Sequence, residues 1–256
     1  MSIPNGVKFS LITVCYKAGE ELAETLASVR AQTHLDIEHI IVDGASPDAA
    51  TRSVLKRLDD GRSIVISEPD KGVYDAMNKG LARATGDVIG FVNAGDLLEA
   101  PDVIAKLAAE FEKGDADVIY GDANMVDPRD IRKVRRFWKG GDYHRENFRK
   151  GWMPPHLGTY IRREAYERFG VFDLRFRIAA DYELMFRFLY KHRLRARYVP
   201  LTIVRFRLGG ASNKSLAHVW KANREVLKAW KVNQEPVSPL IMFAKPLRKL
   251  AQYLGT

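Results

Sequence analysis

The stretch FSLITVCYKAG, from Phe9 to Gly19, is an apolar run that ends in a polar turn. It predicts a buried strand over residues 9–14 and then a helix over residues 19–32, where apolar residues recur at helical spacing. The same alternation continues, with strands predicted at 39–42, 64–67, 88–92 and 118–120 and helices at 48–59, 73–85 and 101–113. It indicates βαβ units, so we predict an α/β fold with a largely parallel central sheet flanked by helices.

The second half of the chain predicts less regular structure. We expect a short strand at 159–161, a helix at 163–169, an amphipathic helix at 181–190 and a strand at 197–206. Two basic amphipathic helices are expected at 215–231 and 240–254, after the break at Gly209-Gly210. Because no clear linker interrupts the chain, we expect one domain at residues 1–214, followed by a basic helical appendage at residues 215–256.

The composition is typical of a globular protein, with 256 residues of which 46% are hydrophobic. A single cysteine, Cys15, excludes an intrachain disulfide and a zinc site built on several cysteines. Residues 1–8 lack the pattern of a signal peptide. No apolar run approaches the ~20 residues that span a bilayer. We therefore expect a cytoplasmic protein.

The net charge of +9 hides an asymmetry between the two halves of the chain. Residues 1–130 carry 13 Lys and Arg against 23 Asp and Glu, whereas residues 131–256 carry 28 against 9. A basic half points to an anionic partner, such as nucleic acid, a phosphorylated substrate or an anionic membrane. The alternative is a basic surface that only faces water.

Aspartates follow four of the five strands predicted in the first half: Asp43, Asp70, Asp96 and Asp122. Parallel sheets bind ligands outside the carboxyl ends of their strands, and converging carboxylates suit a hard divalent ion such as Mg²⁺. Aspartate is also common in turns, which explains any single instance. P-loop and dinucleotide-binding glycine motifs are absent from the sequence.

Several segments resemble, in order, the motifs of family 2 glycosyltransferases. They are the opening stretch at 9–19, Ile41-Val-Asp-Gly-Ala-Ser, Asp70-Lys-Gly-Val-Tyr-Asp-Ala-Met-Asn-Lys-Gly, Ala84-Thr-Gly-Asp, Phe91-Val-Asn-Ala-Gly-Asp, His156, Arg162-Arg163-Glu164 and the segment from Ala179 to Leu184. The resemblance covers residues 9–215 and implies the GT-A fold. Within the family, the chain looks most like bacterial enzymes of exopolysaccharide or lipopolysaccharide synthesis.

This resemblance implies that a sugar moves from a nucleotide-diphosphate donor, with UDP as the default nucleotide, to an acceptor hydroxyl with inversion. A Mg²⁺ or Mn²⁺ ion would stabilise the charge on the leaving diphosphate, and a carboxylate would take the proton of the hydroxyl. The resemblance also suggests a saccharide acceptor linked to a lipid. The basic C-terminal helices, with Trp220, Trp230, Leu247 and Leu250, then fit a peripheral contact with an anionic membrane, or else they pack on the domain.

The resemblance also implies a role for individual residues. Asp181 would be the general base, with Glu183 as the nearby alternative, and Asp96 would bind the metal. Asn93 and Gly95 stand where carboxylates often stand in the family, which implies weaker metal binding by the protein alone. Donor binding is expected of Thr13, Tyr16, Asp43, Asp70, Lys71, Asp75, Asn78, Asn93 and His156. Turn formation by Asp43 and helix capping by Asp70 and Asp181 are the structural alternatives.

Two other functions stay open at this stage. A non-catalytic module that binds nucleotides or polyanions would suit the basic half, and the stretch at 132–149, with Arg and aromatic residues interleaved, is the feature that favours nucleic acid. A nucleotidyltransferase would release pyrophosphate, whereas a glycosyltransferase releases a nucleoside diphosphate. An intact Asp181 argues against a non-catalytic protein, and we expect no nucleic-acid partner.

Overall fold

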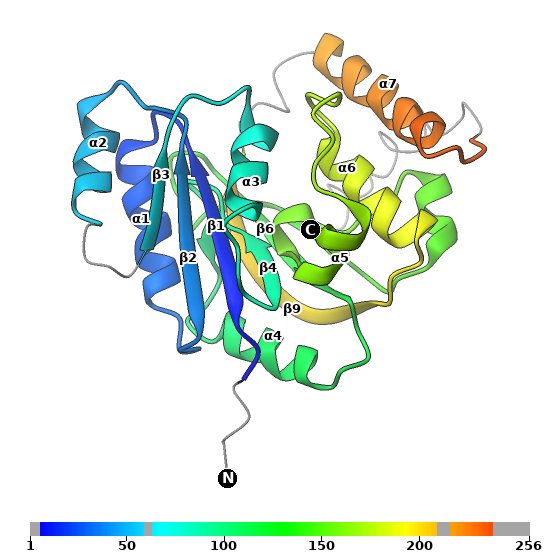
Figure 1. Cartoon of the computed structure of the whole chain (residues 1–256), viewed down its shortest axis with the longest axis horizontal. Coiled ribbons are helices and arrows are strands. Elements are labelled where there is room, and N and C mark those ends of the chain that lie inside the picture. Colours follow the sequence, from blue (N-terminus) through cyan, green and yellow to red (C-terminus); the bar gives the residue numbers. More distant parts are fainter. Residues whose placement is uncertain (1–5, 59–62, 209–215, 238–256) are drawn as a thin grey trace.

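The computed structural model describes residues 6–58, 63–208 and 216–237. Strands and helices alternate along the first half of the chain (Figure 1). This half contains β1 (Phe9–Cys15), α1 (Gly19–Arg30), β2 (Ile37–Asp43), α2 (Ala49–Lys56), β3 (Ser63–Ser67), α3 (Val73–Leu81), β4 (Val88–Phe91), β5 (Leu97–Leu98), α4 (Val103–Glu112) and β6 (Val118–Val126). The second half contains β7 (Val134–Trp138), the 3₁₀ turns η1 (Arg145–Lys150) and η2 (His156–Gly158), β8 (Thr159–Arg162), α5 (Arg163–Phe169), α6 (Ala180–Met185), its π-helical continuation η3 (Phe186–Lys191), β9 (Ala196–Arg207) and α7 (Leu216–Val232).

The strands form one sheet in the order β3-β2-β1-β4-β8-β6-β9-β5, and β7 pairs with β6 outside this path. Strands β3, β2, β1 and β4 run parallel, as the alternation of strands and helices predicts. Strand β8 then reverses the direction by pairing antiparallel with both β4 and β6. The sheet is therefore parallel where the first half of the chain builds it and mixed beyond β4.

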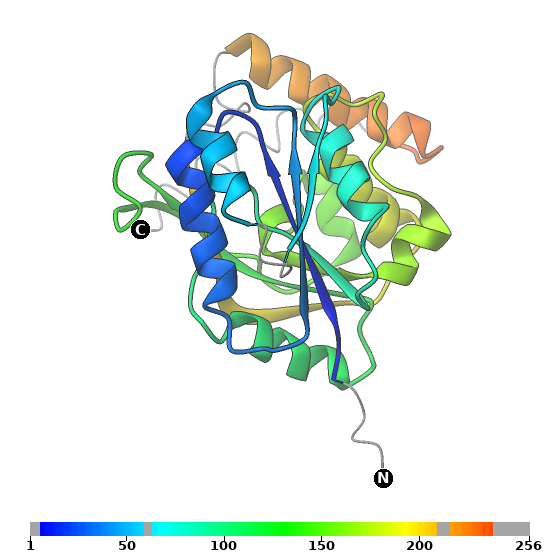
Figure 2. The same ribbon diagram turned by 60° about the vertical axis from the view of Figure 1, so that its left-hand side comes forward.

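Helices cover both faces of the sheet (Figures 1 and 2), which explains why every residue of β1 is buried. Phe9 and Leu11 pack with α4 and with Val29 of α1 on one face. Ile12 packs with α3, α6 and α7 on the other face. Helix α3 approaches β1 closely at Gly80, where a Cβ would lie 2.5 Å from a methyl carbon of Ile12.

Two strands, β7 and β5, were not expected from the sequence. Strand β6 continues to Val126, beyond its predicted end at residue 120, because it pairs there with β7 on one side and β9 on the other. Strand β7 lies within the basic stretch at 132–149. That stretch, which favours nucleic acid on its sequence, thus contains an edge strand of the sheet. The other unpredicted strand, β5, has only two residues and pairs with β9.

Helix α7 is the first of the two predicted C-terminal helices, and it packs against the domain. Val226, Ala229 and Trp230 are buried in the same apolar cluster as β1 and α6, so the expectation that Trp230 meets a membrane is wrong. Trp220 does lie on the surface, with 55% of its area exposed. The helix predicted at 240–254, with Leu247 and Leu250, lies outside the described residues, and the domain boundary at 214/215 stays a prediction.

No helix in the described ranges combines the length and the apolar character needed to cross a membrane.

Candidate active site

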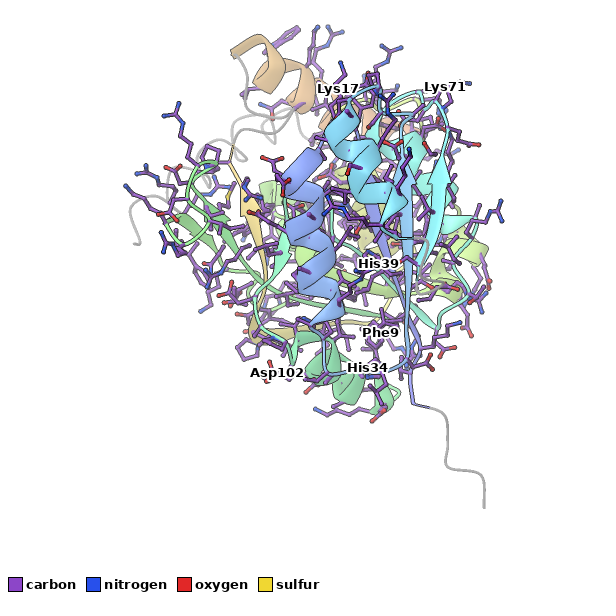
Figure 3. All side chains as sticks on the ribbon, turned by 90° about the vertical axis from the view of Figure 1, so that its left-hand side faces the viewer. Phe9, Lys17, His34, His39, Lys71 and Asp102 are labelled. Carbon is purple, nitrogen blue, oxygen red and sulfur yellow. The ribbon has the colours of Figure 1, made fainter. Side chains whose placement is uncertain are left out.

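The parallel strands β1, β2, β3 and β4 all end at the same edge of the sheet, where the predicted site residues gather. Lys17, after β1, and Lys71, after β3, lie at this edge, and Phe9 and His34 lie at the opposite end of the molecule (Figure 3). The loop after β4 is joined to β1 through a 3.1 Å hydrogen bond from the Ala94 amide to the Val14 carbonyl. Side chains that are distant in sequence therefore share one end of the sheet.

Tyr16, Gly44 and Asp70 meet at this edge. A Cβ on Gly44 would lie 2.4 Å from Oδ2 of Asp70 and 3.3 Å from the Tyr16 ring, so a larger residue would push the Asp70 carboxylate aside. The Tyr16 side chain is 58% exposed, which leaves its ring open to a planar ligand. Asp43 is 1% exposed, and its carboxylate accepts hydrogen bonds from the Ser46 amide and from the Ser67 hydroxyl at 2.6 Å. The Asp43 carboxylate thus holds the turn that follows β2, and donor binding by Asp43 stays a prediction.

The loop that leads into α3 is fixed by its own polar groups. Asp70 accepts a 2.8 Å hydrogen bond from the Gly72 amide, and Asp75 accepts one of 2.9 Å from the Lys71 amide. Lys79 donates to the Pro69 carbonyl at 2.6 Å. The Lys71 side chain is exposed at the rim of this edge. Asp70 and Asp75 thus hold the loop that presents Lys71.

Thr13 and Asn78, both expected to bind the donor, have other partners in the structure. Thr13 has no exposed surface, and its hydroxyl lies 2.9 Å from a ring nitrogen of His39. The Asn78 amide group exchanges two hydrogen bonds, of 2.9 and 3.0 Å, with the backbone of Phe172. Thr13 lies inside the sheet, and Asn78 fastens α3 to the loop after α5, so direct contact of either side chain with the donor stays a prediction.

A cavity of about 570 Å³ opens beside this edge. Its polar lining brings together Glu21, Asn93, Asp96, His156, Arg177, Asp181 and Arg207, and its apolar lining includes Tyr74, Met77, Met125, Trp138 and Phe206. The cavity thus joins three residues predicted for metal or donor binding with the predicted base. Asp122, the remaining aspartate at a predicted strand end, is instead bonded to the Tyr198 hydroxyl and the Gly140 amide.

The turn after β4 supplies the oxygen ligands of the cavity. Asp96 is 8% exposed, and burial raises the pKa of its carboxyl to about 8 against the opposing charge of Arg207. Arg207 is held in place by a 2.6 Å hydrogen bond to the Gly95 carbonyl. The side-chain oxygen of Asn93 is buried and has no hydrogen-bond partner among the described residues. These two oxygen-bearing groups are suited to a cation that also takes ligands from elsewhere.

Asp181 stands at the start of α6 and faces the same cavity. One carboxylate oxygen accepts a 2.8 Å hydrogen bond from the Tyr182 amide and lies 3.3 Å from the Tyr74 hydroxyl. Burial raises the pKa of Tyr74, so Tyr74 stays a neutral donor. The carboxylate is oriented from α3 and α6 together, which is what a general base requires.

His156 packs between the rings of Phe91 and Phe172, with centroid distances of 5.6 and 5.7 Å. Its two ring nitrogens are buried, and neither has a hydrogen-bond partner in the part of the chain that the structure describes. Burial lowers the pKa of His156, although the charge of Asp181 acts in the opposite direction. A neutral imidazole that faces a polar cavity with unused nitrogens is suited to bind a ligand.

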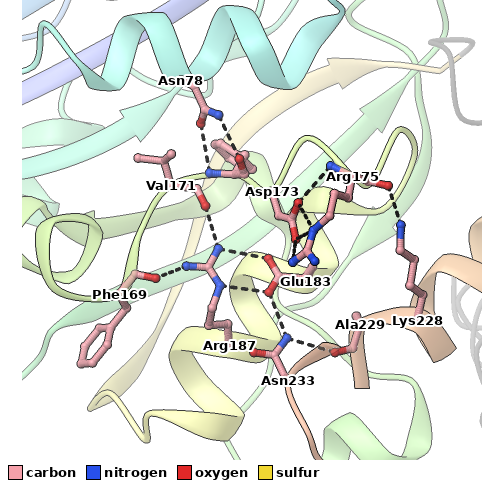
Figure 4. A network of polar contacts seen from close by, with 11 residues as sticks. Asn78, Phe169, Val171, Asp173, Arg175, Glu183, Arg187, Lys228, Ala229 and Asn233 are labelled. Atoms are coloured by element: carbon pink, nitrogen blue, oxygen red, sulfur yellow. Dashed lines mark hydrogen bonds and ion pairs between the residues drawn. The ribbon is translucent and has the colours of Figure 1, made fainter. Parts of the chain in front are cut away.

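Glu183, the alternative base, serves the fold instead (Figure 4). It is 2% exposed and pairs with Arg187 at 2.9 Å. The same carboxylate accepts a 2.9 Å hydrogen bond from Asn233, which directly follows α7. Arg187 also donates to the carbonyls of Phe169, Gly170 and Val171. A carboxylate that is buried and paired in this way is not available to an acceptor hydroxyl.

A metal site made by the protein alone is not present in the described ranges, since no three His, Cys, Asp or Glu side chains there are grouped to hold an ion. The weaker metal binding expected from Asn93 and Gly95 stays a prediction. Tyr74, Glu21 and Arg177 line the cavity although the sequence did not indicate them. Tyr74 belongs to the segment starting at Asp70 that resembles the family, and it lies in the first turn of α3.

Comparison with known proteins identifies the family. Residues 10–170 match the family described as Glycosyl transferase family 2. An uncharacterised glycosyltransferase of Mycobacterium tuberculosis is 33% identical over 187 residues, which cover 70% of this chain and 67% of the relative. The PGL/p-HBAD biosynthesis glycosyltransferase of Mycobacterium bovis is 31% identical over 210 residues, which cover 80% of this chain and 79% of the relative. The chain belongs to glycosyltransferase family 2.

Solved structures share the fold. A TarS structure from S. aureus, residues 1–349, has a TM-score of 0.67 at 16% identity, covering 95% of this chain and 72% of that one. This chain spans 43% of the length of the longer TarS chain. The mannosyltransferase PcManGT from Pyrobaculum calidifontis, in complex with GDP-Man and Mn²⁺, has a TM-score of 0.65 at 21% identity, covering 97% of this chain and 72% of that one. The fold is therefore GT-A, as the resemblance implied.

Proposed function

We propose that this protein is an inverting, metal-dependent glycosyltransferase that moves a sugar from a UDP-sugar to an acceptor hydroxyl. The observation that carries the proposal is the shared cavity, which is lined by Asp181, Asp96 and His156. The cavity thus offers a base for the acceptor hydroxyl. It also offers oxygen ligands for a cation that would bind the diphosphate of the donor. TarS has been solved with UDP-GlcNAc and PcManGT with GDP-Man, which supports a nucleotide-sugar donor.

In this proposal the nucleoside binds near Gly44, with the exposed ring of Tyr16 and the carboxylate of Asp70 as its neighbours. From there the diphosphate reaches the turn after β4, and Lys71 lies at the rim. Arg207 and His156 offer a positive charge and unused nitrogen atoms inside the cavity. These groups counter the negative charge that develops as the bond to the sugar breaks.

Asp96 and Asn93 fit a divalent ion such as Mg²⁺ or Mn²⁺, because a buried carboxylate and an unused amide oxygen line the same wall. Two protein ligands leave positions for the diphosphate oxygens and for water. When bound, such an ion neutralises charge on the diphosphate leaving group. Protein and donor would therefore bind the ion together.

In this proposal the acceptor binds beside Asp181, with Trp138 and Phe206 of the cavity lining as its apolar contacts. The aromatic rings offer flat apolar surfaces to a sugar, and Asp181 takes the proton of the attacking hydroxyl. A lipid-linked saccharide of surface polysaccharide synthesis is the acceptor class that we propose. Exposed Trp220, with Arg224 4.9 Å from its ring, supports a contact of α7 with an anionic membrane surface.

The proposal is tested by the thermal stability of the purified protein with UDP, GDP and dTDP, each with and without Mn²⁺ or Mg²⁺. A ligand that binds only the folded protein raises the melting temperature. We expect a shift that needs both UDP and the metal, and its loss in Asp96→Asn. Asp102→Asn is the matched control, because it makes the same change on an exposed residue beside α4.

A folded protein that responds to none of the nucleotides would contradict the proposal. Products are measured with UDP-glucose, UDP-galactose and UDP-N-acetylglucosamine as donors, and release of UDP is expected. Release of pyrophosphate would instead indicate a nucleotidyltransferase. Salt-sensitive binding of RNA or DNA without any nucleotide response would indicate a polyanion-binding module.

A further inference from the structure

Helix α7 holds the loop that leads to Asp181. We call residues 170–179, between α5 and α6, the α5–α6 loop. Glu225, at the middle of α7, accepts hydrogen bonds from three consecutive amides of this loop: those of Arg177 at 3.1 Å, Ile178 at 2.9 Å and Ala179 at 2.8 Å. A carboxylate bonded to three backbone N–H groups is a strong, charge-assisted contact.

Those three amides lie directly before α6, whose first residues are Ala180 and Asp181. Amides at the start of a helix have no partners within the helix, so they need acceptors from outside. The N-cap residue of α6, Ala179, makes no side-chain hydrogen bond that caps the helix. Glu225 supplies that acceptor from a helix more than forty residues later in the chain.

The segment that Glu225 holds also forms part of the candidate active site. Arg177 and Ile178 line the cavity. The Ile178 carbonyl accepts a 2.9 Å hydrogen bond from the Tyr74 hydroxyl, and the same hydroxyl lies 3.3 Å from Asp181. A shift of this segment would therefore move a wall of the cavity, the Tyr74 hydroxyl and the Asp181 carboxylate together.

Helix α7 is a firm support for this contact. Trp230 is fully buried, its ring is tilted against that of Phe186 with the centroids 4.4 Å apart, and it donates a 3.0 Å hydrogen bond to the Tyr182 hydroxyl. Lys228 donates to the Arg175 carbonyl at 2.7 Å, and Asn233 reaches Glu183 (Figure 4). The C-terminal half of α7 is thus fixed to α6. Glu225 and Lys228 fix α7 to the α5–α6 loop.

We infer that Glu225 is a positioning residue for the transfer reaction: its carboxylate fixes the backbone at 177–179 and thereby sets the place of Asp181 and Arg177 in the cavity. The inference rests on the proposed function, in which Asp181 is the base. Glu225 itself touches neither donor nor acceptor. Its removal should therefore slow turnover and leave donor binding intact.

The test compares Glu225→Ala, Glu225→Gln and the control Lys221→Ala, an exposed position on the same helix. Turnover is measured as UDP released from whichever UDP-sugar the wild-type protein consumes, and binding as the Kd of UDP with Mn²⁺. Misplacement of reacting groups by ~1 Å costs about 10²-fold in rate, so we expect kcat to fall by about ten- to a hundredfold in Glu225→Ala with the UDP Kd unchanged. Gln keeps a single acceptor oxygen and should fall in between.

Hydrogen exchange of the amides at 177–179 gives a second measurement that needs no substrate. We expect faster exchange there in Glu225→Ala and unchanged exchange in α4. If Glu225→Ala does not fold, Glu225→Gln carries both measurements. Turnover within about twofold of wild type in a folded variant, or an equal loss in Lys221→Ala, overturns the inference.

Asp181→Asn is measured in parallel to separate the two proposals. If it is inactive while Glu225→Ala is fully active, only the positioning role fails. If Asp181→Asn is as active as wild type, or if wild type consumes no UDP-sugar, the proposed function fails. If the proposed function fails, hydrogen exchange still tests the contact by itself. Unchanged exchange at 177–179 in Glu225→Ala would show that Glu225 does not hold these amides.

Discussion

The Tyr74 hydroxyl lies 3.3 Å from a carboxylate oxygen of Asp181 and joins two segments that are 107 residues apart in sequence. The hydroxyl has one proton and two acceptors, because the Ile178 carbonyl is 2.9 Å away. Burial raises the pKa of Tyr74, so the proton stays on the hydroxyl at physiological pH. Asp181 is thus oriented by a neutral donor that adds no charge, and it can still accept a proton from an attacking hydroxyl.

Asp181→Asn should abolish transfer without weakening donor binding. Asparagine has nearly the same shape, and its oxygen can still accept hydrogen bonds from Tyr74 and from the Tyr182 amide. It cannot take the proton of the acceptor, and general-base catalysis contributes about 10²- to 10⁴-fold. We expect a fall in kcat of that order and an unchanged Kd for UDP with Mn²⁺. Turnover equal to wild type would remove Asp181 as the base.

Glu183→Ala should have effects opposite to those of Asp181→Asn: the fold becomes less stable, and transfer activity is retained. Glu183 is 2% exposed, and Arg187, 13% exposed, would lose its charged partner. Breaking a buried pair on one side costs about 3–5 kcal/mol of unfolding free energy. Urea denaturation measures that loss, and turnover per folded molecule is measured well below the melting temperature. An unchanged urea midpoint would show that the pair does not support the fold, and an inactive folded variant would reinstate Glu183 as the base.

Stability of the protein without metal should fall as pH rises. Burial raises the pKa of folded Asp96 to about 8, above its unfolded value of about 4. Between these values the unfolded chain gives up its proton and the folded chain keeps it, so the free energy of unfolding contributed by Asp96 decreases with rising pH. Asp96→Asn should lack this decrease. The melting temperature of both proteins across this pH range is the measurement, and parallel curves would contradict the assignment.

The strand ends were predictable because they depend on local patterns. An apolar run followed by Asp-Gly or Asn-Ala-Gly-Asp identifies both a buried strand and its turn, which placed Asp43 and Asp96 at one edge of the sheet. The helical pattern predicted the place of Asp181 at the start of a helix, and the family resemblance alone suggested it as the base. These residues owe their position to the elements on which they lie.

Residues whose role depends on a distant partner were not predictable. Asn78 lies on α3, one helical turn after Asp75, but its hydrogen-bond partner Phe172 is 94 residues away in sequence. The apolar face of α7 suits a membrane as well as a protein core, and only packing against Phe186 decides the place of Trp230. Strand β7 was obscured because an edge strand tolerates the exposed Arg135 and Phe137. Periodicity reports which face is apolar and does not report what covers it.

Gly44→Ala should weaken nucleotide binding with little effect on stability. The new Cβ would lie 2.4 Å from Oδ2 of Asp70, at the end of a flexible side chain, so Asp70 can turn away and the fold remains. That movement removes the carboxylate from the place proposed for the nucleoside and crowds the Tyr16 ring. We expect the Kd of UDP to rise by about tenfold, the effect of losing one or two hydrogen bonds. Gly6→Ala is the matched control, because its Cβ would make only an ordinary 3.6 Å contact with Glu112. If calorimetry shows the same UDP affinity in Gly44→Ala and wild type, the nucleoside does not lie over Gly44.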